Sequence, residues 1–83
     1  MNKFLVEIYL PAAMRSYDVW IPPDVRVAEI TPLAANALSR MSGGLYRVKG
    51  TPLLCWRESG QILNIDKTPW ELGLRNGSRL LLI

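Results

Sequence analysis

The chain has no histidine, one cysteine and only seven acidic residues among its 83 positions. Without histidine it lacks the commonest general base and metal ligand among side chains. A nucleophile with a neighbouring base therefore cannot be assembled, and no acidic cluster has the spacing of a calcium loop. A single cysteine forms no disulfide within the chain, so nothing requires an oxidising compartment. We predict a cytoplasmic protein that is not an enzyme and has no catalytic residue, metal site, cofactor or small-molecule substrate.

Long apolar runs are also missing. The longest stretch without a charged residue spans positions 30–39, whereas a membrane-spanning helix needs about twenty apolar residues. Near the N-terminus, Glu7 and Pro11 interrupt the apolar residues and no convincing cleavage site follows, so no secretory signal is predicted. We expect no direct membrane insertion, and any recruitment to the inner face of the membrane would come through a partner.

The basic residues are not clustered. The net charge is +3, with the basic side chains spread from Lys3 to Arg79, whereas a nucleic-acid site needs a basic stripe or patch. Two mixtures of basic and aromatic side chains are present: Arg40, Arg47 and Lys49 near Tyr46, and Trp56 beside Arg57. Bases stack on aromatic rings in such settings, but cations after a helix commonly complement the helix dipole. Single-strand nucleic-acid binding is therefore a disfavoured alternative.

The residues that are present predict one small globular domain over 1–83, since 49% are hydrophobic and 20% charged. In residues 3–10 every second side chain is apolar while the others are mixed, and residues 15–21 show the same period of two. Period two with one apolar face is typical of a strand that packs on a core, and two strands this close form a hairpin. Pro22-Pro23 ends the pairing because proline has no backbone N–H to donate.

A different period follows the prolines. Apolar residues recur at intervals of three and four, which predicts one amphipathic helix; they are Val27, Ile30, Leu33, Ala34, Ala37, Leu38 and Met41. Pro32 allows two interpretations. Either the helix begins near Val27 with Pro32 facing solvent, which we favour because Val27 and Ile30 share the buried phase, or Thr31 is the N-cap. Ser42-Gly43-Gly44 is expected to end the helix.

The second half of the chain predicts short strands. Residues 51–56 are interpreted as a third strand and residues 62–63 as a brief strand or extended segment. Residues 78–83 form the last predicted strand, and the chain stops inside it. Its four successive apolar residues are typical of a central strand with neighbours on both sides.

Two turn motifs separate these strands. Thr68-Pro69-Trp70-Glu71 has the form of a capping box, which predicts one helical turn that ends at Gly73. Asn76-Gly77 predicts a turn in which both residues accept positive φ.

The order hairpin, helix, strand, short strand, helical turn and final strand resembles the β-grasp order of ubiquitin. The matching segments cover essentially the whole chain: Phe4-Leu5-Val6, Pro22-Pro23-Asp24, Gly60-Gln61-Ile62-Leu63, Thr68-x-x-Glu71-Leu72-Gly73-Leu74 and Asn76-Gly77-Ser78-Arg79-Leu80-Leu81-Leu82. The resemblance implies an α+β fold, a ubiquitin-like β-grasp whose mixed four- to five-stranded sheet packs on one helix.

Within that superfamily, the segment Ile21-Pro22-Pro23-Asp24-Val25 followed by Val27-Ala28-Glu29-Ile30 and Pro32-Leu33 resembles the bacterial YukD/EsaB group. Members accompany type VII (WXG100, ESX-like) secretion systems of Gram-positive bacteria, and a related domain forms the cytoplasmic end of the membrane component EccD. The resemblance implies an accessory or regulatory component of such a machine. Its expected partner is a membrane-anchored secretion subunit or its ATPase.

A modifier or sulfur carrier is the alternative within the same fold. Activation of such a protein requires a flexible tail that ends in Gly-Gly, whereas the last residues here are Leu80-Leu81-Leu82-Ile83, predicted to lie in the sheet. Conjugation and sulfur transfer are therefore disfavoured.

Strand alternation also predicts which side chains face away from the helix. In the strand order 2-1-5-3-4 that the resemblance supplies, five of them lie on the outer face of the sheet: Leu5, Tyr9, Trp20, Leu81 and Ile83. We expect Trp20 and Leu81 to share one surface, with Leu5 between them, that binds a protein partner or a second copy of the chain. The alternative is ordinary exposed apolar area. Cys55 is expected to be buried and structural, and Trp70 to cover one end of the core.

Overall fold

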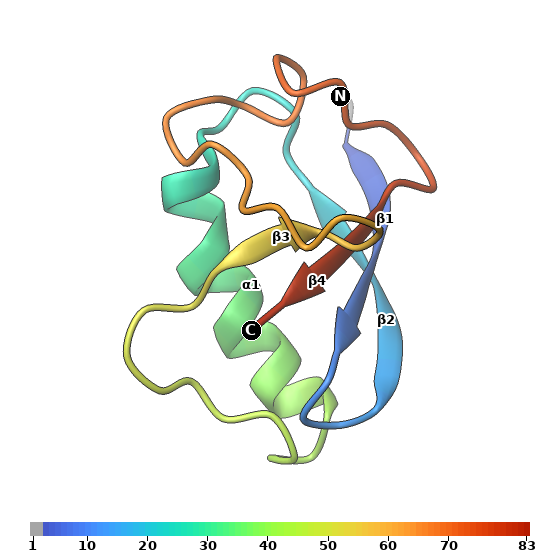
Figure 1. The fold of residues 1–83 in the computed structure, drawn as a ribbon, viewed down its shortest axis with the longest axis vertical. Helices are drawn as coiled ribbons and strands as arrows, with labels where there is room; N and C mark the ends of the chain where they lie inside the picture. The colour runs from blue at the N-terminus through green and yellow to red at the C-terminus, as the bar shows by residue number, and fades with distance from the viewer. Residues whose placement is uncertain (1–2) are drawn as a thin grey trace.

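The computed structural model describes residues 3–83 and assigns four strands and one helix within them. The hairpin β1 (Phe4–Leu10) and β2 (Arg15–Ile21) comes first, followed by the helix α1 (Val27–Met41) (Figure 1). Strands β3 (Leu54–Trp56) and β4 (Arg79–Leu82) complete a sheet of order β2-β1-β4-β3. β4 runs parallel to β1 and antiparallel to β3. This mixed sheet on one helix confirms the predicted ubiquitin-like β-grasp fold.

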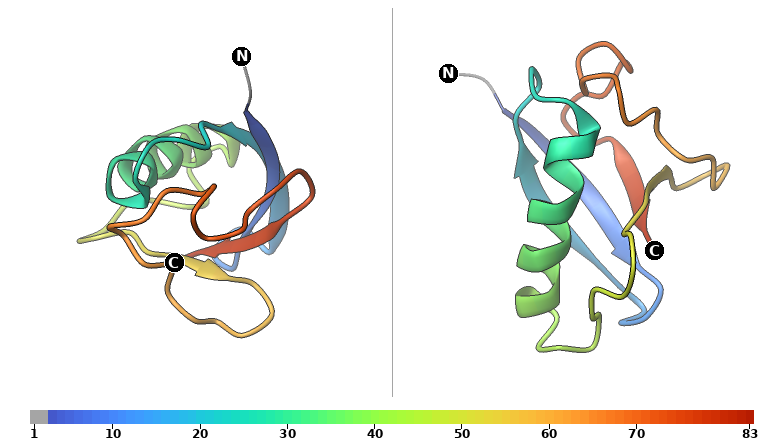
Figure 2. Two further views of the ribbon diagram at one scale, coloured as in Figure 1. Left: turned by 90° about the horizontal axis from the view of Figure 1, so that it is seen from above. Right: turned by 90° about the vertical axis from the view of Figure 1, so that its left-hand side faces the viewer.

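The core lies between α1 and one face of the sheet (Figure 2). Alternate residues of the strands are buried there as predicted, and they are Val6, Ile8, Leu10, Ile21, Leu80 and Leu82. β4 is a central strand, as its run of apolar residues predicts. No helix within residues 3–83 covers the opposite face of the sheet, which is the face with the predicted binding residues.

The helix begins at Val27, which confirms the favoured interpretation, and Pro32 is exposed within it. Arg26, the N-cap residue, makes no side-chain cap hydrogen bond. Instead, the N–H of Val27 donates to the Lys67 carbonyl and the N–H of Ala28 to the Ile65 carbonyl, both at 2.9 Å. A loop distant in sequence therefore satisfies two of the backbone donors that a helix start leaves free.

The helix ends at the predicted segment. Ser42 is the C-cap residue, and the N–H of Gly44 donates to the Ser39 carbonyl at 3.0 Å. Gly43 and Gly44 have positive φ angles of 66° and 85°, which residues with a side chain rarely adopt.

The third strand is shorter than predicted. It covers Leu54–Trp56 rather than residues 51–56, because Pro52 has no N–H to continue the pairing. Leu53 still exchanges two backbone hydrogen bonds with Ile83, at 2.9 and 3.1 Å. The predicted brief strand at residues 62–63 is a single bridge between Cys55 and Ile62.

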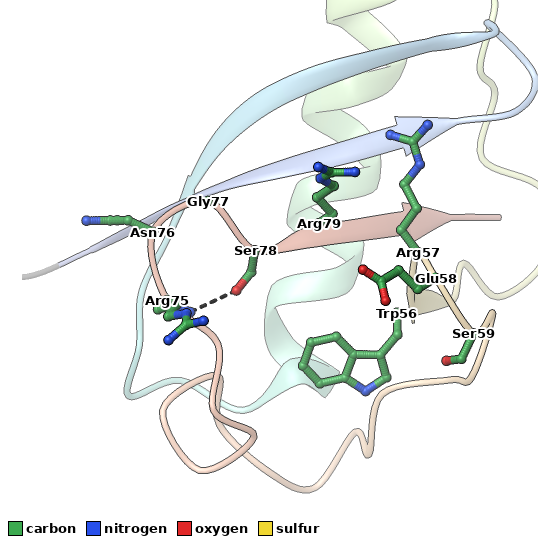
Figure 3. Close-up of a pocket in the computed structure, with 9 residues that line it drawn as sticks. All are labelled: Trp56, Arg57, Glu58, Ser59, Arg75, Asn76, Gly77, Ser78 and Arg79. Atoms are coloured by element: carbon green, nitrogen blue, oxygen red, sulfur yellow. Dashed lines mark hydrogen bonds between the residues drawn. The ribbon is translucent and has the colours of Figure 1, made fainter.

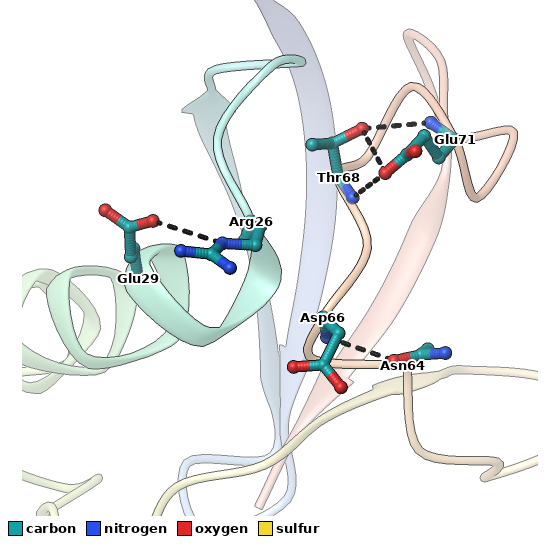
Figure 4. Close-up of polar contacts among 6 residues, drawn as sticks. All are labelled: Arg26, Glu29, Asn64, Asp66, Thr68 and Glu71. Carbon is teal, nitrogen blue, oxygen red and sulfur yellow. Dashed lines mark hydrogen bonds and ion pairs between the residues drawn. The ribbon is translucent and has the colours of Figure 1, made fainter.

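The predicted capping box forms in the loop before β4 (Figure 4). The N–H of Glu71 donates to Thr68 Oγ1 at 3.1 Å, and the N–H of Thr68 donates to Glu71 Oε1 at 3.0 Å. These bonds close one turn, in which the N–H of Leu72 donates to the Thr68 carbonyl, and Gly73 with φ 80° ends it. The same loop supplies the carbonyls that cap α1.

Asn76-Gly77 forms the predicted turn with only Gly77 at positive φ, 88°. The Asn76 side chain bonds to β1, because its Oδ1 accepts a hydrogen bond from the N–H of Leu5 at 2.8 Å. The N–H of Gly77 in turn donates to the Leu5 carbonyl at 2.8 Å. The turn thus fastens the start of β4 to β1.

Within residues 3–83, no helix combines the length and the apolar character that crossing a bilayer demands.

Candidate protein-binding surface

The predicted binding residues lie on the outer face of the sheet. In the strand register, Leu5 of β1 is opposite Trp20 of β2, and Tyr9 of β1 is opposite Leu81 of β4. Trp20 is 60% exposed and Ile83 is 53% exposed, while Leu5, Tyr9 and Leu81 are half-buried. Period two therefore predicted their common face correctly.

These residues do not form one continuous apolar surface. Glu7 lies between Leu5 and Tyr9 on the same face of β1, and its register partners are Asp18 on β2 and Arg79 on β4. This charged row crosses the sheet. The prediction that Leu5 lies between Trp20 and Leu81 is wrong in this detail, because the register pairs Leu81 with Tyr9.

The charged row leaves two apolar areas. The Trp20 area consists of Leu5 and Trp20, and the Leu81 area consists of Tyr9, Leu81 and Ile83. Each area therefore has charged side chains along one side, and polar side chains next to an apolar centre are usual in protein interfaces.

The Trp20 area continues around the edge of the sheet onto the helix. Trp20 also lines a groove of about 330 Å³ between β2 and α1, together with Leu33 and Ala37 of the helix. Leu33 is 72% exposed, although its position in the helical repeat predicts burial. Sequence periodicity missed this residue because the core of so small a domain covers only part of the apolar face of the helix.

Arg57 is a residue of this surface that the sequence reasoning did not place there. Its side chain reaches from the end of β3 to β1, where Nη1 lies 3.1 Å from Glu7 Oε2 and 3.1 Å from Ser16 Oγ. The guanidinium also lies 4.4 Å from the centre of the Tyr9 ring. Arg57 thus covers part of the Leu81 area. Two features of the sequence could have placed Arg57 here. Its charge is opposite to that of Glu7, and strand alternation puts it on the same face as Cys55, two positions earlier.

Trp70 does not cover the core as predicted. Its side chain is 72% exposed and stacks on the Phe4 ring, with ring centres 6.3 Å apart and an angle of 15° between the planes. The neighbouring Pro69 is the fully buried residue of this loop. A compact proline ring fits the space that the capping box leaves at this end of the core.

The remaining candidate groups are buried. Cys55 is fully buried, as predicted, and burial raises the pKa of its thiol. Tyr46 is 6% exposed, and burial raises the pKa of its hydroxyl. Its ring is therefore not available for the base stacking that the nucleic-acid alternative required. Residues 3–83 contain no group of three or more cysteine, aspartate or glutamate side chains arranged to hold a metal ion.

Neither a protein-family model nor a curated protein matches the chain. Solved structures do. The ubiquitin-like domain of the Mycobacterium tuberculosis type VII secretion system protein ECCD1 is 20% identical with a TM-score of 0.81, and the match covers 100% of this chain and 99% of that one. The EccD5 ubiquitin-like domain from Mycobacterium xenopi is 17% identical with a TM-score of 0.84, covering 100% and 94%.

A third match is a chain of the MycP5-free ESX-5 inner membrane complex. It is 16% identical with a TM-score of 0.86, and the match covers 100% of this chain but 21% of that one. At these identities the likeness establishes the ubiquitin-like fold.

Proposed function

We propose that the chain is a non-enzymatic, ubiquitin-like docking component of a type VII secretion system, of the YukD/EsaB kind. It binds a membrane-anchored secretion subunit or its ATPase at the cytoplasmic side of the membrane. The observation that carries the proposal is the full-length likeness to ubiquitin-like domains of two EccD proteins, at TM-scores of 0.81 and 0.84. The similar chain of an inner membrane complex supports recruitment to such a machine.

The Trp20 area is the proposed centre of the contact. Tryptophan is enriched among the few residues that carry most of the energy of protein interfaces. Trp20 is exposed beside Leu5, and the adjoining groove adds the exposed Leu33. Burial of these three side chains gives a partner an apolar anchor, while Glu7, Asp18 and Arg79 form a polar rim next to it.

The Leu81 area is the second proposed part of the contact. Leu81 lies beside Tyr9, whose ring Arg57 partly covers, and Ile83 follows directly after β4. A partner that meets both areas must therefore also complement the charged row between them, which favours specificity over affinity.

Affinity capture from the native host tests the proposal. The tag belongs at the N-terminus, because the backbone of Ile83 is hydrogen-bonded to Leu53. We expect a type VII membrane subunit or ATPase, identified by mass spectrometry, to co-purify after cross-linking. The Trp20→Ser variant should retain roughly a tenth of this subunit or less.

Trp70→Ser is the matched control, since Trp70 is an equally large and exposed side chain outside the sheet. It should retain the subunit to within about twofold. Absence of any secretion subunit from the captured material would refute the function. Equal loss in both folded variants, checked by circular dichroism, would refute the assignment of the surface.

A further inference from the structure

An open cleft of about 640 Å³ lies between the turn after β3 and the loop that leads into β4 (Figure 3). Arg57 and Arg79 come from adjoining strand ends, where the N–H of Arg57 donates to the Arg79 carbonyl at 3.2 Å. Figure 3 shows their side chains extending together toward β1 and away from the Trp56 ring, while Arg75 lies in the loop that leads into β4. The cleft therefore gathers three of the ten basic residues of the chain.

The positive charge of the cleft is only partly compensated. Glu7 pairs with Arg57, and Glu58 is the single acidic residue in the lining. Within residues 3–83, neither Arg75 nor Arg79 belongs to an ion pair. Both are exposed. Two guanidinium groups with free donors thus border one hollow.

Three polar side chains of the cleft each accept one backbone hydrogen bond. Asn76 Oδ1 accepts the N–H of Leu5 at 2.8 Å, and Ser78 Oγ accepts the N–H of Arg75 at 3.0 Å. Ser59 Oγ accepts the N–H of Gln61 at 3.1 Å. They still offer a ligand the Asn76 amide hydrogens and two hydroxyl hydrogens as donors, besides one lone pair on each oxygen. Together with the guanidinium groups of Arg75 and Arg79, the lining has more donors than acceptors.

We propose that this cleft binds a carboxylate-rich peptide segment of a partner protein. Guanidinium groups bind carboxylates through two parallel hydrogen bonds, and the half-buried Trp56 adds an apolar side chain to the lining of the cleft. A nucleic-acid backbone fits less well, because it needs a basic stripe, whereas the lining holds three arginines in one short cleft. The inference goes beyond the docking function proposed above and does not depend on it.

The test uses the purified full chain and a fluorescein-labelled peptide of sequence Glu-Glu-Leu-Glu-Glu-Leu. Anisotropy should show saturable binding at about 150 mM NaCl, and amide NMR shifts should concentrate at Ser59, Gly77 and Ser78. The double variant Arg75→Gln/Arg79→Gln should bind roughly tenfold more weakly. Glu58→Gln should bind about twofold more tightly, because it removes the only like charge in the lining.

The matched control is Arg40→Gln/Arg47→Gln, which loses the same charge at exposed positions near the end of α1. It should change affinity by less than about twofold. If both double variants weakened peptide binding equally, the effect would come from net charge rather than from the cleft, and the proposal would be overturned. Absence of saturable binding, or tighter binding of labelled oligothymidylate than of the peptide, would also overturn it. Because no secretion component is present, failure here leaves the docking function standing.

Discussion

The guanidinium of Arg57 lies 4.4 Å above the centre of the Tyr9 ring, although Arg57 follows β3 and β4 lies between β3 and the β1 strand of Tyr9. The same group pairs with Glu7 at 3.1 Å. One side chain therefore links β1 to the end of β3 across the outer face of the sheet. It also decides how much of Tyr9 a partner can reach.

Replacement of Arg57 by alanine should weaken the fold slightly and uncover Tyr9. The ion pair is half-exposed, with side-chain exposures of 34% and 39%, so we expect a loss of about 1 kcal/mol of unfolding free energy from the ion pair and the cation–π contact together. Urea unfolding measures it. Arg47→Ala, which removes an exposed arginine that bonds only a local carbonyl, should leave the midpoint unchanged. An unchanged midpoint for Arg57→Ala would show that the link does not stabilise the sheet.

Glu71 should stabilise the fold in a pH-dependent way. The N–H of Thr68 donates to its carboxylate and holds the pKa below the ordinary value of 4.5. A lowered pKa in the folded state means that this stability is present above pH 4.5 and is lost as the pH falls through the lowered value. Glu71→Ala should therefore lower the thermal midpoint at about pH 7 and have little effect at about pH 3.

The contrast to Glu71→Ala is Thr68→Ala. It removes the acceptor of the Glu71 N–H and also the hydroxyl that donates to the Glu71 carboxylate at 3.3 Å. It should cost about 1 kcal/mol at neutral pH, and part of that cost should remain in acid, because the bond from the Glu71 N–H does not titrate. If Glu71→Ala lowered the midpoint equally at both pH values, the carboxylate charge would have no part in the capping box.

Pro32→Ala should stabilise the protein. Pro32 is the sixth residue of α1 and is exposed, so its side chain adds little packing, while it removes a backbone hydrogen bond to the Ala28 carbonyl. Interior proline costs a helix about 3 kcal/mol, and its rigidity in the unfolded chain offsets up to about 1 kcal/mol. We expect a gain of about 2 kcal/mol in chemical unfolding. A loss of stability would mean that the ring makes a contact that its exposure conceals.

Cys55 should be unreactive in the folded protein. Its side chain is fully buried, and burial raises the pKa of the thiol, so little thiolate is present near neutral pH. Reaction with an aromatic disulfide reagent, followed by absorbance, should be slower by roughly a hundredfold or more in buffer than in concentrated urea. Rapid labelling of the native protein would show that the β3–β4 pairing opens readily.

Local patterns predicted the elements that depend on neighbouring residues. The hairpin, the start of α1 at Val27 and the Thr68–Glu71 capping box each rest on side chains within a few positions of one another. The partners of the helix start were not predictable in this way. The carbonyls of Ile65 and Lys67 reach α1 only because the loop folds back along the sheet.

The candidate surface was predictable in part. Period two placed Leu5, Tyr9 and Trp20 on the same face, since side chains alternate along any strand. The same alternation places Glu7 between Leu5 and Tyr9. Only the register of β1 with its two neighbours shows that Asp18 and Arg79 extend this break across the sheet. A shift of that register would rearrange the neighbours without altering any pattern in the sequence.

The order of apolar and polar residues alone determined the strands, the helix and the side of each strand that packs on the core. A period of two buries one face of a strand and a period of three to four buries one face of a helix, and burial of apolar side chains stabilises any compact chain. The tertiary structure decided which side chains from distant strands meet: Arg57 over Tyr9, Glu7 between the two apolar areas, and three arginines around one cleft. Those contacts arise from strand register and loop closure, and both are set by hydrogen bonds that form only once the whole sheet is assembled.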